Sequence, residues 1–173
     1  MLRGGPTKPE IIGIALEKLD IKNNETFVDI GCGTGLVSIA AAKYTEKILA
    51  VDRRKTAIEA AQQNLKNAGV LHAVTLILGE APDVLSPYKN VIDKAFIGGT
   101  ANFKEVIELL IPRCRRIVLN AARLELAAEA IWRMKDVGIF DEALLINIAK
   151  GYELKGLTAF EPRNPVFMVV GTC

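Results

Sequence analysis

The chain has 173 residues, of which 50% are apolar and 24% are charged, and its formal net charge is +2. This length and balance predict one globular domain with a core of its own, and a charge so close to zero does not indicate a nucleic-acid partner. No stretch reaches the roughly 18 consecutive apolar residues that a membrane-spanning helix needs, so we expect no membrane partner and a cytoplasmic protein.

The spacing of apolar residues divides the chain into alternating helices and strands. The predicted elements are a helix over 9–19, a strand over 25–30, a helix over 35–44, a strand over 47–52, a helix over 55–69, strands over 73–79 and 91–99, a helix over 102–111, a strand over 115–122, a helix over 124–138, and strands over 143–149 and 165–171. A loop is expected from Lys150 to Asn164, and Pro112 should end the fourth helix.

This alternation predicts an α/β fold with a doubly wound, mostly parallel sheet of seven strands that is covered on both faces by helices. The last two strands have no predicted helix between them, so they should pair antiparallel. We expect a single domain over residues 1–173, in which the Gly- and Pro-rich residues 1–8 are loose or lie across a site.

Histidine and cysteine are sparse and scattered. Cys32, Cys114 and Cys173 form no Cys-x-x-Cys pair, which predicts neither a zinc site nor a disulfide framework. His72 is the only histidine, so a multi-histidine metal site is excluded, and we expect this residue in a polar loop before a strand. The sequence therefore predicts no protein-bound metal.

The stretch "FVDIGCGTG", residues 27–35, is the first candidate functional feature. It reads as a strand, a glycine-rich turn and the start of a helix. Glycine takes positive φ and lets a ligand approach where a Cβ would block it. In open α/β sheets, ligands bind at the carboxyl ends of the strands, where the strand order reverses. Taken alone, the glycines could form only a tight turn.

The residues around the turn indicate which cofactor it holds. A dinucleotide fingerprint is Gly-x-Gly-x-x-Gly, but here Leu36 occupies its third glycine position and would crowd the helix. Asp29 precedes the turn and would repel a pyrophosphate, whereas it suits the ammonium and sulfonium of S-adenosylmethionine. Asp52, at the end of the second strand, can accept hydrogen bonds from both ribose hydroxyls in either cofactor class. After the third strand, Ala81 leaves its backbone free for an adenine edge, and Glu80 or Asp83 can take the exocyclic amine.

The segments "VDIGCGTG", "LAVD" and "LGEAPD" resemble the class I S-adenosylmethionine-dependent methyltransferases. A narrower resemblance, to the cobalt-precorrin C-15 methyltransferases (decarboxylating) of cobalamin biosynthesis, is carried by "GGPTKPEI" at 4–11, "IGGT" at 97–100, "NAARLE" at 120–125 and "EPRNPVFMVVG" at 161–171. This resemblance implies the strand order 3-2-1-4-5-7-6 and a homotetramer. It also implies methylation at C-15 of a cobalt-precorrin of the precorrin-6B type, with loss of CO₂ from the acetate arm at C-12.

The residue arguments and the resemblance together give one set of candidate cofactor-binding residues. The resemblance adds Thr7, in the N-terminal motif, and the whole turn, which would cradle the methionine part. The candidates are Thr7, Asp29, Gly31, Cys32, Gly33, Thr34, Gly35, Asp52, Arg53, Glu80, Ala81 and Gly98.

The corrinoid substrate that the resemblance implies is broad, flat and rich in carboxylates. Gly98 and Gly99 leave space for such a ring, and cationic side chains should line its pocket. We name Gly99, Arg123 and Arg163 as substrate-binding candidates, with Arg123 favoured because it follows strand five. Other cations considered are Lys8, Lys150 and Lys155. We interpret three arginines before strand five as surface or subunit-interface charges on the far side of the sheet: Arg113, Arg115 and Arg116.

No catalytic residue is assigned, because the conjugated ring would itself supply both the electron-rich carbon and the electron sink for decarboxylation. "IGGT" stands where many amino-group methyltransferases carry Asn/Asp-Pro-Pro-Tyr, which argues against methylation of adenine or glutamine nitrogen. Two alternatives stay open at this point: a small tRNA methyltransferase, and a nucleotide-binding module without catalysis.

Overall fold

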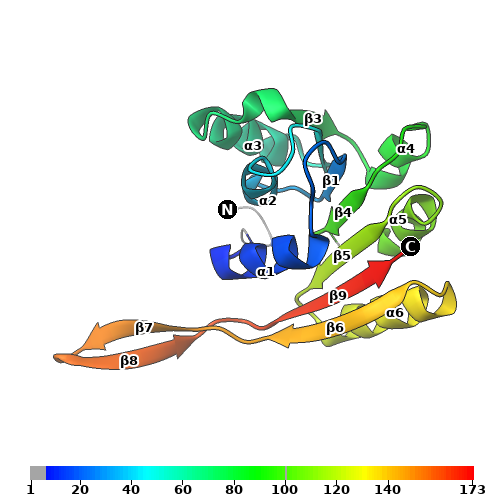
Figure 1. Ribbon diagram of the computed structural model, residues 1–173. Helices are drawn as coiled ribbons and strands as arrows, with labels where there is room; N and C mark the ends of the chain where they lie inside the picture. The colour runs from blue at the N-terminus through cyan, green and yellow to red at the C-terminus, as the bar shows by residue number, and fades with distance from the viewer. Residues whose placement is uncertain (1–6, 100) are drawn as a thin grey trace.

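The fold is built on one twisted sheet, shown in Figure 1 as a computed structural model that describes residues 7–99 and 101–173. Within these residues seven strands join in the order β3-β2-β1-β4-β5-β9-β6. Neighbours among β1 to β5 pair parallel, and β9 pairs antiparallel with both β5 and β6. The strands are β1 (Phe27–Ile30), β2 (Ile48–Asp52), β3 (Val74–Leu78), β4 (Lys94–Ile97), β5 (Arg116–Ala121), β6 (Phe140–Ile146) and β9 (Val166–Thr172). The predicted fold class and strand order are confirmed, with β9 as the seventh strand.

Helices cover both faces of this sheet. On one face α1 (Pro9–Leu19), α2 (Leu36–Ala41) and α3 (Lys55–Asn67) share a core with Phe27, Phe96 and Val118. On the other face α4 (Ala81–Leu85), α5 (Phe103–Leu110) and α6 (Leu124–Asp136) pack over Ile97 and Leu119. None of the helices in the described part of the chain is long and apolar enough to cross a membrane.

Local sequence explains where these elements begin and end. Proline at the first helical position suits α1, because its fixed φ is helical and no hydrogen bond is lost there. The helix buries Ile11, Ala15 and Leu19 and ends at Leu19, because Asp20 after it takes a left-handed φ of 49°. β1 and β4 are buried along their whole length, as expected for central strands covered on both faces.

Residues 149–162 differ from the prediction. Instead of a loop they form a separate antiparallel hairpin of β7 (Ala149–Leu154) and β8 (Leu157–Pro162), which projects away from the main sheet in Figure 1. Lys155 and Gly156 both take positive φ at its tip, as a type I′ turn requires. Every residue of β7 is exposed, so no buried face imposed the alternating pattern by which a strand is recognised.

Three local features of the sequence can be compared with the structure. α5 ends at Leu110, just before Pro112, as predicted. His72 lies exposed in a short 3-10 helix (Leu71–Ala73) directly before β3. In the "GEAPD" segment after β3, Glu80 is the N-cap of α4 and Ala81 is its first residue.

Candidate functional site

The glycine turn after β1 adopts the left-handed conformation that its sequence predicts. The φ angles of Gly31, Gly33 and Gly35 are 74°, 56° and 78°. A Cβ on Gly31 would lie 2.5 Å from the backbone nitrogen of Gly99, so the turns after β1 and β4 touch through their backbones. At Gly33 a Cβ would meet nothing closer than 3.9 Å. The turn is therefore closed by packing at Gly31 and open at Gly33, where a ligand can approach.

Asp29 lies beneath this turn and is only 1% exposed. Its Oδ2 accepts hydrogen bonds from the Ser38 backbone nitrogen (3.1 Å) and from Ser38 Oγ (2.6 Å), which joins α2 to β1 across the turn. Its Oδ1 has no partner among the described residues. Burial raises the pKa of Asp29 to about 6, although the hydrogen bonds from Ser38 act in the opposite direction. One oxygen of the Asp29 carboxylate therefore lies next to the glycine turn without a hydrogen-bond donor. Negative charge at this oxygen favours a cation there.

Asp52, at the end of β2, already accepts four hydrogen bonds. Oδ2 receives the Gly33 backbone nitrogen and Arg54 Nη2, and Oδ1 receives the Arg54 backbone nitrogen and Nε, all at 3.0 Å. Burial acts to raise the pKa of Asp52, but the hydrogen bonds from Arg54 and Gly33 outweigh it and leave the pKa below its ordinary value. These four bonds occupy about all the acceptor positions of a carboxylate.

Arg54 is one of the site residues that the sequence did not predict. Its Nη2 lies 4.0 Å from the position that a Cβ on Gly33 would take, so the guanidinium covers the open part of the turn. A ribose that bonds to Asp52 must therefore displace Arg54. The sequence shows only two adjacent arginines after Asp52, and nothing in that pattern tells which of them turns back onto the carboxylate.

The ends of β2 and β3 meet beside Asp52, as expected. The Gly79 backbone nitrogen donates to the Asp52 carbonyl oxygen (3.1 Å), and Arg53 Nη1 lies 3.4 Å from Glu80 Oε1. Glu80 precedes α4, and Ala81 is its first residue. The structure therefore brings the candidates for the ribose and adenine to one place.

Cys32 and Thr34 contribute mainly to the structure of the turn. Cys32 is buried, and burial raises its thiol pKa far above the ordinary value, so it stays a neutral thiol. The carbonyl oxygen of Thr34 accepts a hydrogen bond from Asn64 Nδ2 (2.9 Å), which joins the turn to α3. No group of three or more potential metal-ligating side chains converges within residues 7–99 and 101–173.

The ends of β4 and β5 supply the other side of the site. The backbone nitrogens of Gly98 and Gly99 both donate to the Ile30 carbonyl oxygen, at 2.8 and 3.1 Å, which holds this turn against the end of β1. Arg123 is exposed and directly precedes α6. Asn120, near the end of β5, was not among the predicted site residues, although its segment was noted.

The N-terminal segment and the base of the hairpin meet at the same edge of the sheet. Lys8 Nζ donates to the Asn164 carbonyl oxygen (3.1 Å), and Lys150 Nζ pairs with Glu10 at 3.1 Å. Arg163 is at this base, where its guanidinium pairs with Glu161 at 2.9 Å. Thr7 is half-buried, whereas the rest of the N-terminal motif before it, residues 4–6, lies outside the described residues, as does Thr100.

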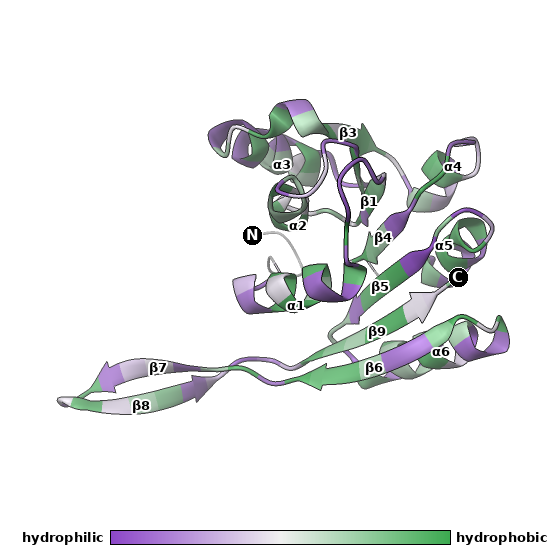
Figure 2. Ribbon diagram, viewed as in Figure 1, coloured by the Kyte–Doolittle hydropathy of each residue, from purple (hydrophilic) through white to green (hydrophobic). Residues whose placement is uncertain are grey.

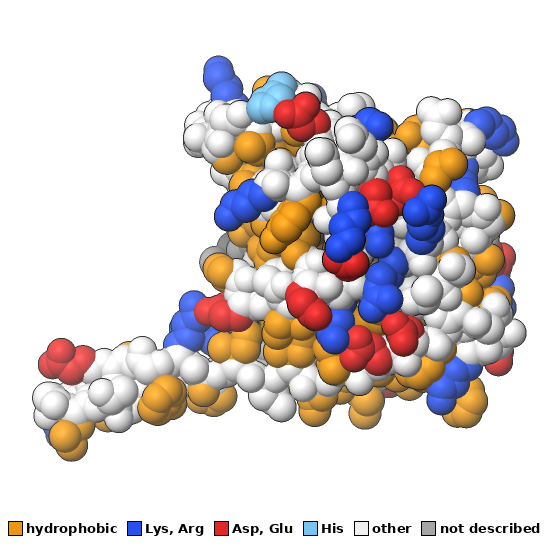
Figure 3. Space-filling model, viewed as in Figure 1, with side chains coloured by type: hydrophobic (Ala, Val, Ile, Leu, Met, Phe, Trp, Pro, Cys, Tyr) orange, Lys and Arg blue, Asp and Glu red, His pale blue; other side chains and the backbone are white. Residues whose placement is uncertain are grey.

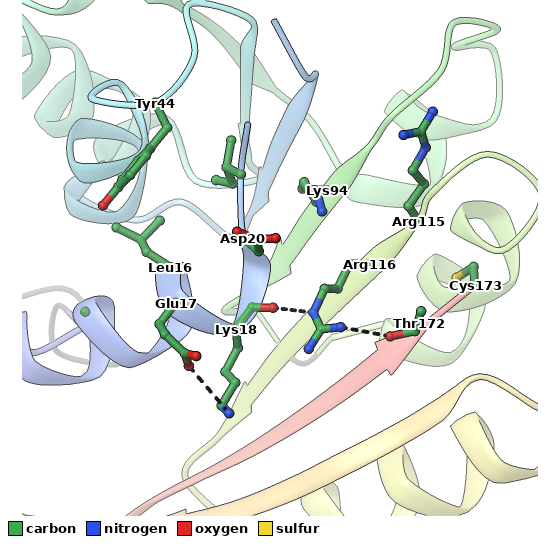
Figure 4. A pocket seen from close by; sticks show the side chains of 12 residues that line it. Leu16, Glu17, Lys18, Asp20, Tyr44, Lys94, Arg115, Arg116, Thr172 and Cys173 are labelled. Carbon is green, nitrogen blue, oxygen red and sulfur yellow. Dashed lines mark hydrogen bonds and ion pairs between the residues drawn. The ribbon is translucent and has the colours of Figure 1, made fainter. Parts of the chain in front are cut away.

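A cavity of about 790 Å³ lies at the opposite edge, where β4 and β5 begin. Figure 4 shows Arg116 between Lys18, whose carbonyl oxygen accepts its Nε, and Thr172. Lys94 pairs with Glu25 at 3.8 Å and Arg115 with Asp93 at 3.6 Å. Figure 3 likewise shows basic and acidic side chains next to one another on this face. Three basic side chains that line the cavity, Lys94, Arg115 and Arg116, are paired with acidic side chains, and no glycine turn among the described residues borders it. The carboxyl edge of the sheet therefore remains the candidate active site.

The interpretation of Arg113 from the sequence is wrong. It was expected to be a surface or subunit-interface charge, but its guanidinium donates to the carbonyl oxygens of Leu85, Tyr88 and Leu109. It therefore ties α4 and the following loop to α5 and is part of the packing.

Comparisons with known proteins agree with this geometry. A model of the precorrin methyltransferase domain matches residues 3–172. The chain is 44% identical over 173 residues to a protein of Methanosarcina mazei named probable cobalt-precorrin-6B C(15)-methyltransferase (decarboxylating), covering 97% of this chain and 94% of that one. A protein of the same name from Archaeoglobus fulgidus is 39% identical over 170 residues, covering 98% and 99% of the two chains.

Solved structures point to the same group. A crystal structure titled precorrin 8W decarboxylase, from Methanobacterium thermoautotrophicum, superposes with a TM-score of 0.92 at 32% identity and covers 98% of this chain and 92% of that one. A precorrin-6Y C5,15-methyltransferase from Geobacter metallireducens superposes with a TM-score of 0.90 at 30% identity, covering 99% and 91%.

Proposed function

This chain belongs to the precorrin methyltransferase family, and from that premise we propose that it methylates C-15 of a cobalt-precorrin and promotes loss of CO₂ from the C-12 acetate arm. The methyl donor is S-adenosylmethionine. The observation that carries the proposal is the meeting of three features at one edge of the sheet: the open glycine turn, Asp52, and the side-chain-free turn of Gly98 and Gly99.

The residues at the ends of β1, β2 and β3 suit S-adenosylmethionine, which supplies an electrophilic methyl group on a positively charged sulfur. The space over Gly33 leaves room for the ligand, and the uncompensated oxygen of Asp29 favours positive charge. Asp52 accepts the ribose hydroxyls once Arg54 moves away. Glu80 and Ala81 bind the adenine edge.

The chain acts on the substrate mainly by positioning it. Gly98 and Gly99 let the flat ring approach the donor closely, and Arg123 and Arg163 bind its carboxylates from two elements of the same edge. Holding two reactants in line removes much of the entropic part of the barrier without any acid or base from the protein. The conjugated ring supplies the nucleophilic carbon for methylation and takes up the electrons released by decarboxylation.

The outlying hairpin supports an oligomer, and we propose a homotetramer in the cytoplasm. A two-stranded hairpin is marginal on its own in water. Its side chains include Tyr152, Leu154, Leu157 and Phe160, which are 48%, 50%, 76% and 69% exposed. Figure 2 shows hydrophobic colour on parts of this hairpin, among hydrophilic parts and away from the core. Packing against copies of the same chain would bury these side chains.

The reaction can be tested with cobalt-precorrin-6B and S-adenosylmethionine labelled with ¹³C in the methyl group. We expect a product that carries one labelled methyl group and lacks one CO₂, identified by mass spectrometry. Calorimetric titrations with NADH and with total tRNA test the alternatives. Tight binding of NADH without any response to S-adenosylhomocysteine would overturn methyl transfer, and salt-sensitive tRNA binding would favour an RNA substrate.

A further inference from the structure

Asn120 has a buried side-chain amide that lacks hydrogen bonds. Both Nδ2 and Oδ1 are inaccessible to solvent, and neither has a partner among the described residues. Buried polar groups are nearly always hydrogen-bonded, because leaving one unpaired forfeits its hydration. An amide whose donor and acceptor are both unused can therefore bind a group from outside the folded chain once the atoms that cover it move aside.

The position of Asn120 tells where such a group arrives. It is the second-last residue of β5 and lies opposite Met168 on β9. On the other side, Leu119 pairs with Ile97, the last residue of β4, so the Gly98–Gly99 turn follows at the level of Asn120. The amide is therefore next to the turn that faces the glycine turn of β1.

The Asn120 side chain points to the face of the sheet that α1 covers. Side chains alternate along β5, and Val118, two residues earlier, packs in the core shared with α1. Arg116 Nε bonds to the carbonyl oxygen of Lys18, so the end of α1 lies at the start of β5. α1 thus begins near the other end of β5, and the Asn120 side chain lies on the face of the sheet that α1 covers.

We propose that Asn120 binds the corrinoid substrate, with Nδ2 donating a hydrogen bond to a peripheral carboxylate of the ring. This inference rests on the proposed function. The substrate is favoured over the methyl donor because β5 is two strands from β1, whose turn and neighbour β2 hold the donor residues. Donation is favoured over acceptance because carboxylates on the ring periphery accept and cannot donate.

The first test replaces Asn120 by leucine, which has a similar size and no polar atoms. Because the free enzyme leaves the amide unpaired, we expect Asn120→Leu to raise Tm by about 2–4 °C. The KM for cobalt-precorrin-6B should rise at least about tenfold, while the Kd for S-adenosylhomocysteine changes less than about twofold. Asn90→Leu, at an exposed asparagine before β4, is the matched control and should leave KM unchanged.

The second test, Asn120→Asp, keeps the shape of the side chain and, when assayed at a pH high enough to ionise a buried carboxyl, replaces the donor by a carboxylate. Like charges should raise KM for the corrinoid further than leucine does. A KM near that of the wild type for this variant would overturn the assignment of Nδ2 as donor.

Other outcomes overturn the inference in distinguishable ways. A lower Tm for Asn120→Leu with unchanged KM would assign the amide to folding, and a Kd for S-adenosylhomocysteine weakened about tenfold would assign it to the methyl donor. If the wild type is active and Asn120→Leu has the same KM for the corrinoid, this inference is refuted and the proposed function is not. A wild type with no activity on the corrinoid refutes the proposed function itself and the inference with it.

Discussion

Two buried carboxylates on neighbouring strands differ in charge behaviour because their donors differ. Asp29 receives hydrogen bonds from Ser38, and burial raises its pKa to about 6. Asp52 is also subject to burial, yet the bonds from Arg54 and Gly33 lower its pKa. Asp52 therefore stays ionised across the neutral range, whereas Asp29 takes up a proton as the pH falls toward 6. Of these two carboxylates, Asp52 is the one that stays an anion at neutral pH, but Arg54 has to move before a ligand can use its oxygens.

The raised pKa of Asp29 makes stability depend on pH. The ordinary pKa is 3.8, so the native state binds the proton more tightly than the unfolded chain, and this contribution is lost as pH rises from about 4 to about 6. Asp29→Asn avoids the buried charge. Its free energy of unfolding should exceed that of the wild type by up to about 3 kcal/mol near pH 8 and approach it near pH 4.

Urea unfolding at the two pH values measures this difference, with the exposed Asp83→Asn as control. A stability difference between Asp29→Asn and the wild type that does not change with pH would show that Asp29 does not titrate as described. At neutral pH we also expect weaker binding of S-adenosylmethionine by Asp29→Asn, because the anion next to the turn is lost.

Asp52 and Arg54 should affect donor binding in opposite directions. Asp52→Asn should weaken S-adenosylhomocysteine binding by about 1–3 kcal/mol, since a ribose hydroxyl loses a charged acceptor. Arg54→Met should strengthen it by up to about tenfold, because the guanidinium no longer competes for Asp52. Calorimetry measures both, and Glu59→Gln, exposed on α3, is the control. Weaker binding by Arg54→Met would mean that Arg54 contacts the ligand instead of competing with it.

At the scale of elements, the glycine turn depends on the close approach of two backbones. Gly31 is the position at which a Cβ would collide with the other backbone. Gly69, after α3, is a useful comparison. Its φ of 73° is nearly the same, but a Cβ there would meet nothing within 4 Å. Gly31→Ala adds a methyl group 2.5 Å from the backbone nitrogen of Gly99, which cannot withdraw without moving the end of β4.

We expect Gly69→Ala to lower the free energy of unfolding by about 1–2 kcal/mol, the penalty of a left-handed φ alone. Gly31→Ala carries the same penalty and the overpacking of a buried contact, about 3 kcal/mol or more in total. Urea unfolding of the two variants measures the difference. Equal losses would mean that the turns of β1 and β4 can separate freely.

The elements also show what the sequence could predict. The turn at 31–35 and the end of β2 were predictable because glycine spacing and a terminal acid are local signals, and both lie where expected. The hairpin of β7 and β8 was not, because its strands bury no face. Arg54 and Asn120 were not either, because a hydrogen bond made or missing in three dimensions leaves no pattern in the chain.

At the scale of the whole molecule, the doubly wound order brings the ends of β1, β2 and β4 to one edge and separates them from the charged cavity at the other. β9 enters the sheet antiparallel and therefore starts at the site edge. The hairpin joined to it projects from the same edge. Assembly through the hairpin would place a neighbouring copy close to the substrate side of the site.

The hairpin variants Leu157→Ser and Phe160→Ser, combined, should shift the protein toward smaller species in sedimentation equilibrium. The reason is that these two large apolar side chains, 76% and 69% exposed in the single chain, would no longer be available for burial between copies. Leu124→Ser, at a leucine that is 62% exposed on α6, is the control and should leave the assembly intact. A wild type that sediments as a monomer at micromolar concentration would contradict the proposed tetramer.

The location of the donor site is tested most directly by a crystal structure of the wild-type protein with S-adenosylhomocysteine. We expect the nucleoside between the glycine turn and Asp52, with its ribose on the carboxylate and Arg54 moved off Gly33. Density for the ligand in the cavity lined by Lys94 and Arg116, with Arg54 still bonded to Asp52, would contradict the account.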